Sequence, residues 1–239
     1  MWHREWHCQL GVPLSGLSSS GILVPAPHCW TSQQWRPAAQ RFTWFLCVSR
    51  FDGPRPTLVT CRVAERVYEM LEYLKQVIQD QFDASLAMLD SCIGLCPAEH
   101  WEGQIGQAPF WQVAYHTLFF VDLYLSQDEA SFRPPPAFRE EAIDLGLANH
   151  RSGAAATAIT PCEKELVADY VEHCRAKAAE VIAAETEQSL AKPSGFPWYP
   201  MSRGEHHLAS IRHIQHHAGQ LSAYLRKHSD KNAPWIGKL

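Results

Sequence analysis

The chain has 239 residues, which suits one domain of ordinary size or one domain with an appendage. Hydrophobic residues make up 46% and charged residues 19%, so a folded chain with a real core is expected. The formal net charge is −4 and the lysines and arginines are scattered, which argues against nucleic acid as a partner. The sequence contains no apolar run of about 18 residues, so we expect no membrane span. Its eight cysteines are dispersed, which is typical of reduced thiols in a cytoplasmic protein.

The first 60 residues differ in composition from the rest of the chain. They contain five of the nine tryptophans and no lysine, and proline, serine and glycine recur without a helical or alternating period. Three interpretations stand: an arm that docks through its aromatic side chains, a targeting peptide, and an extension from an upstream reading frame that the cell does not make. We favour the last, and expect residues 1–60 to lie outside the domain and to be disordered or non-native.

The segment from about residue 62 has a clear helical period. Its apolar residues recur at spacings of three, four and seven, which predicts one amphipathic helix or two in series: Val63, Val67, Met70, Leu71, Leu74, Ile78, Phe82 and Leu89. Gly94 and Pro97 are expected to end it. A second helix is predicted from about Pro109, with the sequence FWQVAYHTLFFVDLYLS. Because this segment is apolar nearly all round, it should be the most buried.

The connection that follows, residues 126–160, is longer than most loops in compact domains. We expect it to contain a short helix near FREEAIDLGL and to have a functional or covering role. The third helix is predicted to open on a capping box, with Thr160 as N-cap, Pro161 in the first turn and Glu163 three residues on. A fourth helix is predicted over roughly 204–228, after the helix-breaking sequence KPSGFPWYP.

Four long helices without a credible strand predict an all-α fold, and more specifically a four-helix bundle. The long connection between the second and third helices permits a crossover in place of a hairpin. We assign residues 61–230 to the bundle and residues 231–239 to a C-terminal tail.

Two histidines of the fourth helix provide the first functional signal. His213 and His217 are four residues apart, so on a helix they lie one above the other on the same face. Two imidazoles at this spacing can supply half of a tetrahedral metal site, although most such pairs in proteins are structural or solvated. His216 is turned by about 100° from His217 and is not expected to join the pair.

A third histidine, His116, lies in the apolar stretch of the second helix. A lone histidine there is more often a satisfied core residue than a ligand, but each ring nitrogen of a buried imidazole needs a partner. An ion shared with His213 and His217 would satisfy one nitrogen of each ring, and facing helices of a bundle are where such sites are built. Three neutral histidine ligands would leave positions open for water or substrate, which is the catalytic pattern.

Three further residues are candidates to support the ligands. Gln112 lies one turn before the histidine of the second helix, and Gln220 follows His217 on its side of the fourth, so either could hydrogen-bond a ligand or a water molecule. His206 lies on the same helix face as the pair and could be a fourth ligand, but we expect a solvated helix end there.

Other residues favour ordinary structural roles. Cys92 and Cys96 flank Gly94, which indicates a helix end and not a zinc knuckle. Asp122 is expected to be solvated or paired with an arginine. Three aromatic residues could line a pocket, although packing against the bundle is the commoner role for each: Trp111, Trp198 and Tyr199.

The chain resembles the DinB/YfiT-like superfamily in four segments: WQVAYHTLFFVDLYLS, FRPPPAF, ELVADYVEHCRAK and IRHIQHHAGQLSAYLR. The resemblance covers about residues 63–228. It implies a four-helix bundle of up-down-down-up order and a divalent metal bound by one histidine of the second helix and two, four apart, of the fourth. On this chain those ligands are His116, His213 and His217. Characterised members include metal-dependent S-transferases that use low-molecular-weight thiols and a thiol-dependent isomerase.

The residues and the resemblance together favour a divalent-metal-dependent enzyme, specifically a transferase that uses a small-molecule thiol on an electrophilic substrate. A cation at the three histidines would stabilise a thiolate and lower the pKa of the thiol. The alternatives are a metal-dependent hydrolase and a non-enzymatic bundle that a metal only stabilises. Imidazole suits several metals, of which we expect zinc first, with nickel or iron as alternatives. We expect a cytoplasmic protein without a membrane or nucleic-acid partner, and leave a homodimer open.

Overall fold

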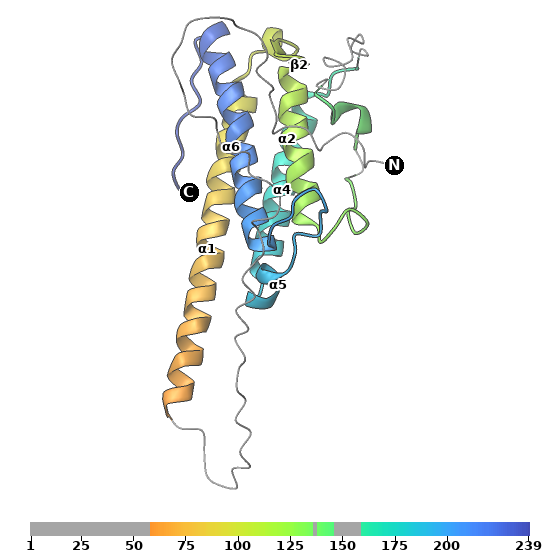
Figure 1. Ribbon diagram of the computed structural model, residues 1–239. Coiled ribbons are helices and arrows are strands. Elements are labelled where there is room, and N and C mark those ends of the chain that lie inside the picture. Colours follow the sequence, from red (N-terminus) through yellow and green to blue (C-terminus); the bar gives the residue numbers. More distant parts are fainter. Residues whose placement is uncertain (1–57, 136–137, 146–158) are drawn as a thin grey trace, which may run out of the picture.

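The computed structural model describes residues 58–135, 138–145 and 159–239 (Figure 1). The prediction for residues 1–60 therefore falls almost entirely outside the described residues. In chain order the elements are α1 (Leu58–Leu95), the 3₁₀ turn η1 (Ala98–His100), β1 (Gln104–Ile105), β2 (Ala108–Pro109), α2 (Phe110–Leu125), the 3₁₀ turn η2 (Glu140–Ala142), α4 (Lys164–Ala184), α5 (Glu187–Ala191) and α6 (Arg203–His228). None of the described helices is long and apolar enough to cross a membrane.

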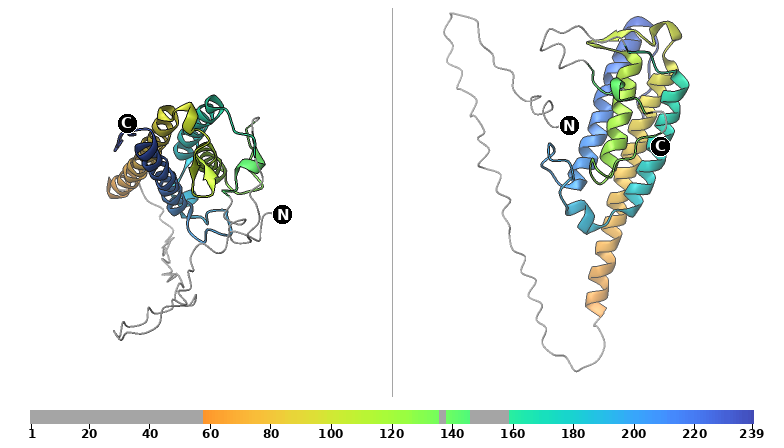
Figure 2. Two further views of the ribbon diagram at one scale, coloured as in Figure 1. Left: turned by 90° about the horizontal axis from the view of Figure 1, so that it is seen from above. Right: turned by 90° about the vertical axis from the view of Figure 1, so that its right-hand side faces the viewer.

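The predicted all-α bundle is confirmed, and its four long helices are α1, α2, α4 and α6. α1 and α2 lie diagonally opposite each other, and each packs against both α4 and α6 (Figure 2). At the upper end of Figure 1, Lys164 at the start of α4 donates to the carbonyls of Gly94 and Cys96 at the end of α1. At the lower end, Arg203 at the start of α6 donates to two carbonyls at the end of α2.

These contacts show which helix ends lie together, and the resulting order of the helices is the up-down-down-up order that the resemblance implied. α2 and α4 both run downward in Figure 1, whereas α1 and α6 run upward. The connection between α2 and α4 therefore joins the lower end of α2 to the upper end of α4, which is the crossover that its length permits and not a hairpin. Within it, the short helix predicted near residues 138–147 is reduced to η2, and residues 146–158 lie outside the described part.

α1 is one continuous helix of 38 residues, but the bundle uses only part of its apolar face. The apolar residues from Ile78 onward contribute to the core. Val67 and Met70 are 50% and 66% exposed, because this end of α1 extends below the other helices (Figure 1). The spacing of the apolar residues thus predicted α1 correctly, but it could not show that the other helices of the bundle do not extend to its lower end.

α2 is buried on every side, as predicted: all 16 of its residues are buried. The core around it includes the fully buried Trp111, while Trp198 and Tyr199 are half-buried against the same core. The three aromatic residues therefore pack, which was the commoner of the two roles considered for them. A small hairpin that pairs Ile105 with Ala108 precedes α2, although no strand was expected.

The capping box predicted at Thr160 is wrong. α4 begins at Lys164, and its N-cap, Glu163, makes no side-chain cap hydrogen bond. The cause is tertiary: the indole Nε1 of Trp101 donates to the carbonyl of Cys162 at 2.7 Å, and the Cys162 side chain is buried. These contacts hold the segment extended, so the helix begins later than its sequence signal.

A capping box that was not predicted does open α6. The hydroxyl of Ser202 accepts from the backbone N–H of Glu205, whose carboxylate accepts from the backbone N–H of Ser202 at 2.8 Å. The S-x-x-E pattern was therefore readable in the sequence. The cap fixes where α6 begins, one residue before the predicted 204.

The predicted C-terminal tail packs along the outside of α1. The side chain of Gln81 donates to the carbonyl of Gly237 at 3.3 Å, and Lys238 pairs with Asp80 at 2.8 Å. Ala233 is buried and belongs to the core. The tail is therefore attached to the bundle over residues 80–81 of α1.

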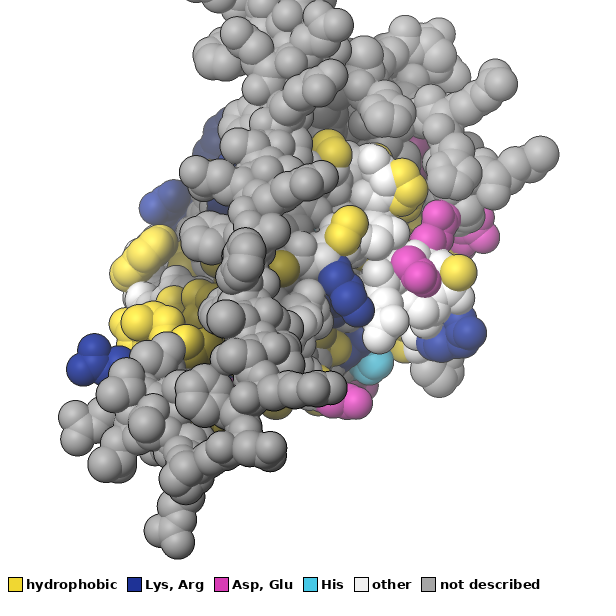
Figure 3. Space-filling model, turned by 60° about the horizontal axis from the view of Figure 1, so that its bottom comes forward, with side chains coloured by type: hydrophobic (Ala, Val, Ile, Leu, Met, Phe, Trp, Pro, Cys, Tyr) yellow, Lys and Arg dark blue, Asp and Glu magenta, His cyan; other side chains and the backbone are white. Residues whose placement is uncertain are grey.

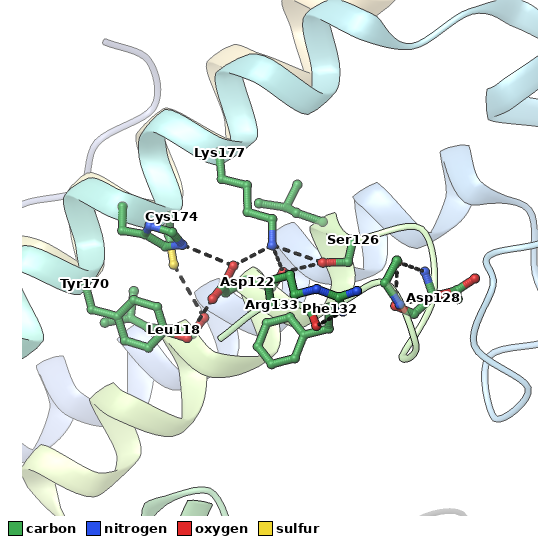
Figure 4. Close-up of polar contacts among 12 residues, drawn as sticks. Leu118, Asp122, Ser126, Asp128, Phe132, Arg133, Tyr170, Cys174 and Lys177 are labelled. Carbon is green, nitrogen blue, oxygen red and sulfur yellow. Dashed lines mark hydrogen bonds and ion pairs between the residues drawn. The ribbon is translucent and has the colours of Figure 1, made fainter. Parts of the chain in front are cut away.

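Asp122 is neither solvated nor paired with an arginine, contrary to prediction. It is fully buried, and its carboxylate accepts from Lys177 at 2.6 Å and from the hydroxyl of Tyr170 at 3.0 Å (Figure 4). His173 lies 3.3 Å from the same carboxylate. All three partners come from α4, so this polar cluster ties α2 to α4.

Replacing Asp122 with alanine tests this tie. The change leaves Lys177 partly buried without its carboxylate, so we expect the free energy of unfolding to fall by about 3–5 kcal/mol. Denaturant unfolding followed by circular dichroism measures it. The control is Glu172→Ala, which removes an exposed partner of Arg175 and should change stability little. Small and equal losses in the two variants would show that Asp122 does not join the helices.

Candidate metal centre

The structure brings together the three histidines that were predicted as metal ligands. His116 on α2 and His213 and His217 on α6 each offer one ring nitrogen, and these nitrogens lie within 4.8 Å of one another. The ring centroid of His116 lies 5.5 Å from that of His213 and 5.0 Å from that of His217. Within the described part of the chain, this is the one group of three or more such side chains that could hold a metal ion.

The orientation of α6 about its own axis explains why two of its histidines face α2. The thiol of Cys92 on α1 donates to the carbonyl of Ala218, and Ile214 and Leu221 are fully buried. These contacts direct one side of α6 into the bundle. One turn apart on the adjoining face, His213 and His217 have ring centroids 4.6 Å apart.

A backbone carbonyl orients the imidazole of His116. Its Nδ1 lies 2.6 Å from the carbonyl oxygen of Ile143, so Nδ1 bears the proton and donates, which leaves the lone pair on Nε2. Gln112 donates to the neighbouring carbonyl of Asp144 at 2.6 Å. Gln112 therefore bonds the segment that orients His116 and not the imidazole itself, which differs from the direct contact considered for it.

A side-chain amide orients His217. Its Nδ1 lies 2.8 Å from Oε1 of Gln220, so it donates to that oxygen and leaves Nε2 free. The amide nitrogen of Gln220 in turn donates to Nε2 of His216 at 3.2 Å. Gln220 thus contacts the histidine that the sequence indicated. His216 is exposed and is hydrogen-bonded to this amide.

His213 has the least satisfied ring of the three. Its Nδ1 is buried and has no hydrogen-bond partner in the described structure. Such atoms are rare in folded proteins because burying a polar atom without a partner costs free energy. A bound ion is one group that would relieve this cost, and neutral imidazole nitrogens suit divalent first-row metals. The residues present therefore fit a divalent metal.

Burial keeps the three imidazoles uncharged. Desolvation is the largest cause in each case, and it lowers the pKa to about 3 for His116, about 2 for His213 and about 4 for His217. The His217 ring lowers the pKa of the other two further. Neutral imidazole is the form that binds a metal, so the site is ready for one at neutral pH without losing a proton.

His206 lies apart from this group and is not solvated, contrary to prediction. It is 2% exposed, with its ring centroid 4.6 Å from Tyr124, 5.3 Å from Phe196 and 5.0 Å from Tyr199. The segment containing Phe196 and Tyr199 folds back over the first turn of α6, which the helical period cannot show. Burial lowers the pKa of His206 to about 4.

The cysteines from Cys92 onward are free, buried thiols: Cys92, Cys96, Cys162 and Cys174. Burial raises the pKa of Cys92 to about 12 and that of Cys96 to about 11. The Cys92 thiol donates to the carbonyl of Ala218 on α6 and the Cys96 thiol to the carbonyl of Pro97, and neither belongs to the histidine group. Cys92 and Cys96 are therefore poor nucleophiles and lie at a helix end, as predicted, and not in a zinc knuckle.

The buried histidines make stability depend on pH in the metal-free protein. Four of them keep folded-state pKa values of about 4 or below, against an ordinary value of 6.5: His116, His206, His213 and His217. Between those values the unfolded chain binds more protons than the folded one. We therefore expect the free energy of unfolding to fall as pH drops from 7 to 5, by up to about 1.4 kcal/mol per pH unit for each histidine.

Urea unfolding at a series of pH values, with a chelator present, measures this slope. In each His→Gln variant at one of the four positions, the free energy of unfolding should fall less steeply with decreasing pH than in the unaltered protein. A flat profile between pH 7 and 5 would contradict this, because it would mean that the folded chain takes up protons over that range as readily as the unfolded chain does.

The comparison with family models agrees with the fold. The model described as the DinB superfamily matches residues 81–221, more than half of the chain. The match contains His116 and extends along α6 past His217. No match was found among curated proteins or among solved structures. The chain therefore belongs to the DinB superfamily.

Proposed function

We propose that this protein is a divalent-metal-dependent enzyme whose metal is held by His116, His213 and His217. The observation that carries the proposal is the convergence of three neutral imidazoles, two of which have Nδ1 bonded to the chain and Nε2 free. Structural zinc sites usually close with four protein ligands, whereas three ligands leave a position for water or substrate. The histidine group supports the second arrangement.

Within that class we propose a transferase that joins a low-molecular-weight thiol to an electrophilic substrate, with zinc as the first expectation and nickel or iron as alternatives. A bound divalent cation would stabilise the thiolate and so lower the pKa of the thiol. The four cysteines from Cys92 onward favour an external thiol, because they are buried and the pKa values of Cys92 and Cys96 are raised.

The surroundings of the histidines favour an anionic partner. The three proposed ligands are neutral, so none of them would offset the charge of a divalent cation. The Phe120 ring lies 4.8 Å from His116 and 5.7 Å from His213, measured between ring centroids. This apolar wall strengthens the attraction between a cation and an anion by excluding water, which suits a thiolate.

Two other functions would use the same residues. In a hydrolase, the open position would take a water molecule, and the neutral ligands would equally favour its deprotonation. In a non-enzymatic bundle, an ion would only fasten α2 to α6 and leave no reaction to measure. The burial of the three histidines is compatible with each, so activity has to separate them.

The ligand assignment predicts the metal content of four alanine variants. His116→Ala, His213→Ala and His217→Ala should each lose the metal, since two imidazoles hold an ion far more weakly than three. His216→Ala should retain it, because His216 is exposed and outside the group. Elemental analysis at fixed pH measures the occupancy, and circular dichroism confirms the fold. Full occupancy in His116→Ala, or complete loss in His216→Ala, would disprove the assignment.

The proposed reaction predicts metal-dependent consumption of a small thiol. A panel of thiols is mixed with epoxide and aryl halide electrophiles, and the loss of free thiol is followed over time. We expect turnover with at least one pair, its loss after chelation, and its return when metal is added back. His216→Ala should stay active and His217→Ala should not. Ester hydrolysis without any thiol would favour the hydrolase, and metal-dependent stability without turnover would favour the non-enzymatic bundle.

A further inference from the structure

The lower part of α1 presents an apolar face that the bundle does not cover. Val67, Met70, Leu74 and Val77 are 50%, 66%, 44% and 37% exposed. This part of the helix extends below the ends of α2, α4 and α6 (Figures 1 and 2). In the space-filling view with the lower end brought forward, hydrophobic side chains gather at the left edge, on the side of α1 (Figure 3). Exposed apolar patches of this kind mark interaction sites.

The spacing of these four residues is that of a helix that pairs with another helix. They follow one another at intervals of three, four and three, which are the a and d positions of a heptad. We call the four residues, Val67, Met70, Leu74 and Val77, the α1 seam. A seam of period 3.5 indicates a single long partner helix lying along it.

We propose that the α1 seam binds the same seam of a second copy of this chain, with the two α1 helices antiparallel. A two-fold axis requires one patch to be complementary to itself. In the antiparallel register, Val67 of one copy faces Val77 of the other and Met70 faces Leu74. Each apolar residue of the seam then meets an apolar residue.

Charge complementarity supports this direction and this register. Arg66 and Asp80 flank the seam at equivalent heptad positions, and the antiparallel register places Arg66 of each copy beside Asp80 of the other. A parallel pairing would place Arg66 beside Leu71 instead. The Asp80 side chain already accepts from Lys238, yet it retains 18% exposure.

The C-terminal tail extends the apolar surface beyond the seam. Its attachment at Gln81 and Asp80 places it next to the upper end of the seam. Trp235 and Leu239 on the tail are 79% and 65% exposed. In the antiparallel pair, the start of one α1 would run toward the tail of the other copy, so these side chains would enlarge the interface.

Sedimentation velocity of the full chain over a range of concentrations tests the proposal. We expect a dimer for the unaltered protein and a monomer for Leu74→Lys. The matched control is Leu208→Lys, since Leu208 is 51% exposed on α6 outside the seam, and this variant should remain dimeric. Circular dichroism and metal content should be unchanged in both variants, because neither residue is in the core or among the histidines.

A charge exchange tests the direction of pairing. Arg66→Glu and Asp80→Arg should each raise the dimer dissociation constant several-fold, and the double variant should return it toward the original value. A protein that is monomeric at every concentration overturns the proposal, as does a dimer that Leu74→Lys leaves intact. Loss of dimer in both single variants without recovery in the double variant overturns the antiparallel register.

Discussion

The burial of three uncharged imidazoles between α2 and α6 is the constraint on which the site depends. An imidazole in an apolar core is costly unless its nitrogens have partners. The chain satisfies Nδ1 of His116 through a backbone carbonyl and Nδ1 of His217 through an amide oxygen, while Nδ1 of His213 has no hydrogen-bond partner among the residues that the structure describes. A divalent cation at the histidine group would give the imidazoles a partner and remove this cost. Its binding would require neither deprotonation nor rearrangement of the ligands, since they are already neutral and already assembled.

Polar clusters away from the site hold the two helices that form it. Asp122 ties α2 to α4 through Lys177. At the start of α6, Arg203 and His207 both donate to the buried carboxylate of Glu185, which follows α4. Burial alone would raise the pKa of Glu185, but hydrogen bonds from His207, Ser189 and Arg203 outweigh it and lower the pKa to about 2. The carboxylate therefore stays charged and keeps α6 in position relative to α4 over the physiological pH range.

Local patterns predicted the helices and the histidine pair, because a helical period and a spacing of four depend only on neighbours along the chain. What the sequence could not show depends on contacts between distant segments. Trp101 delays the start of α4 through Cys162, 61 residues away, and Asp122 meets Lys177 at a separation of 55. His206 is buried by a segment that the sequence marks only as a helix breaker. From the sequence, the α1 seam is indistinguishable from the part of α1 that faces the core, because periodicity shows an apolar face but not which helix covers it.

X-ray absorption spectroscopy of the zinc-loaded protein tests the central claim most directly. The three-histidine site predicts three imidazole nitrogens at about 2.0–2.1 Å, with a small non-protein ligand completing the shell. Addition of a thiol should introduce one sulfur at about 2.3 Å while the three imidazoles remain. Two or fewer imidazoles, or a protein sulfur in the shell before any thiol is added, would contradict the account.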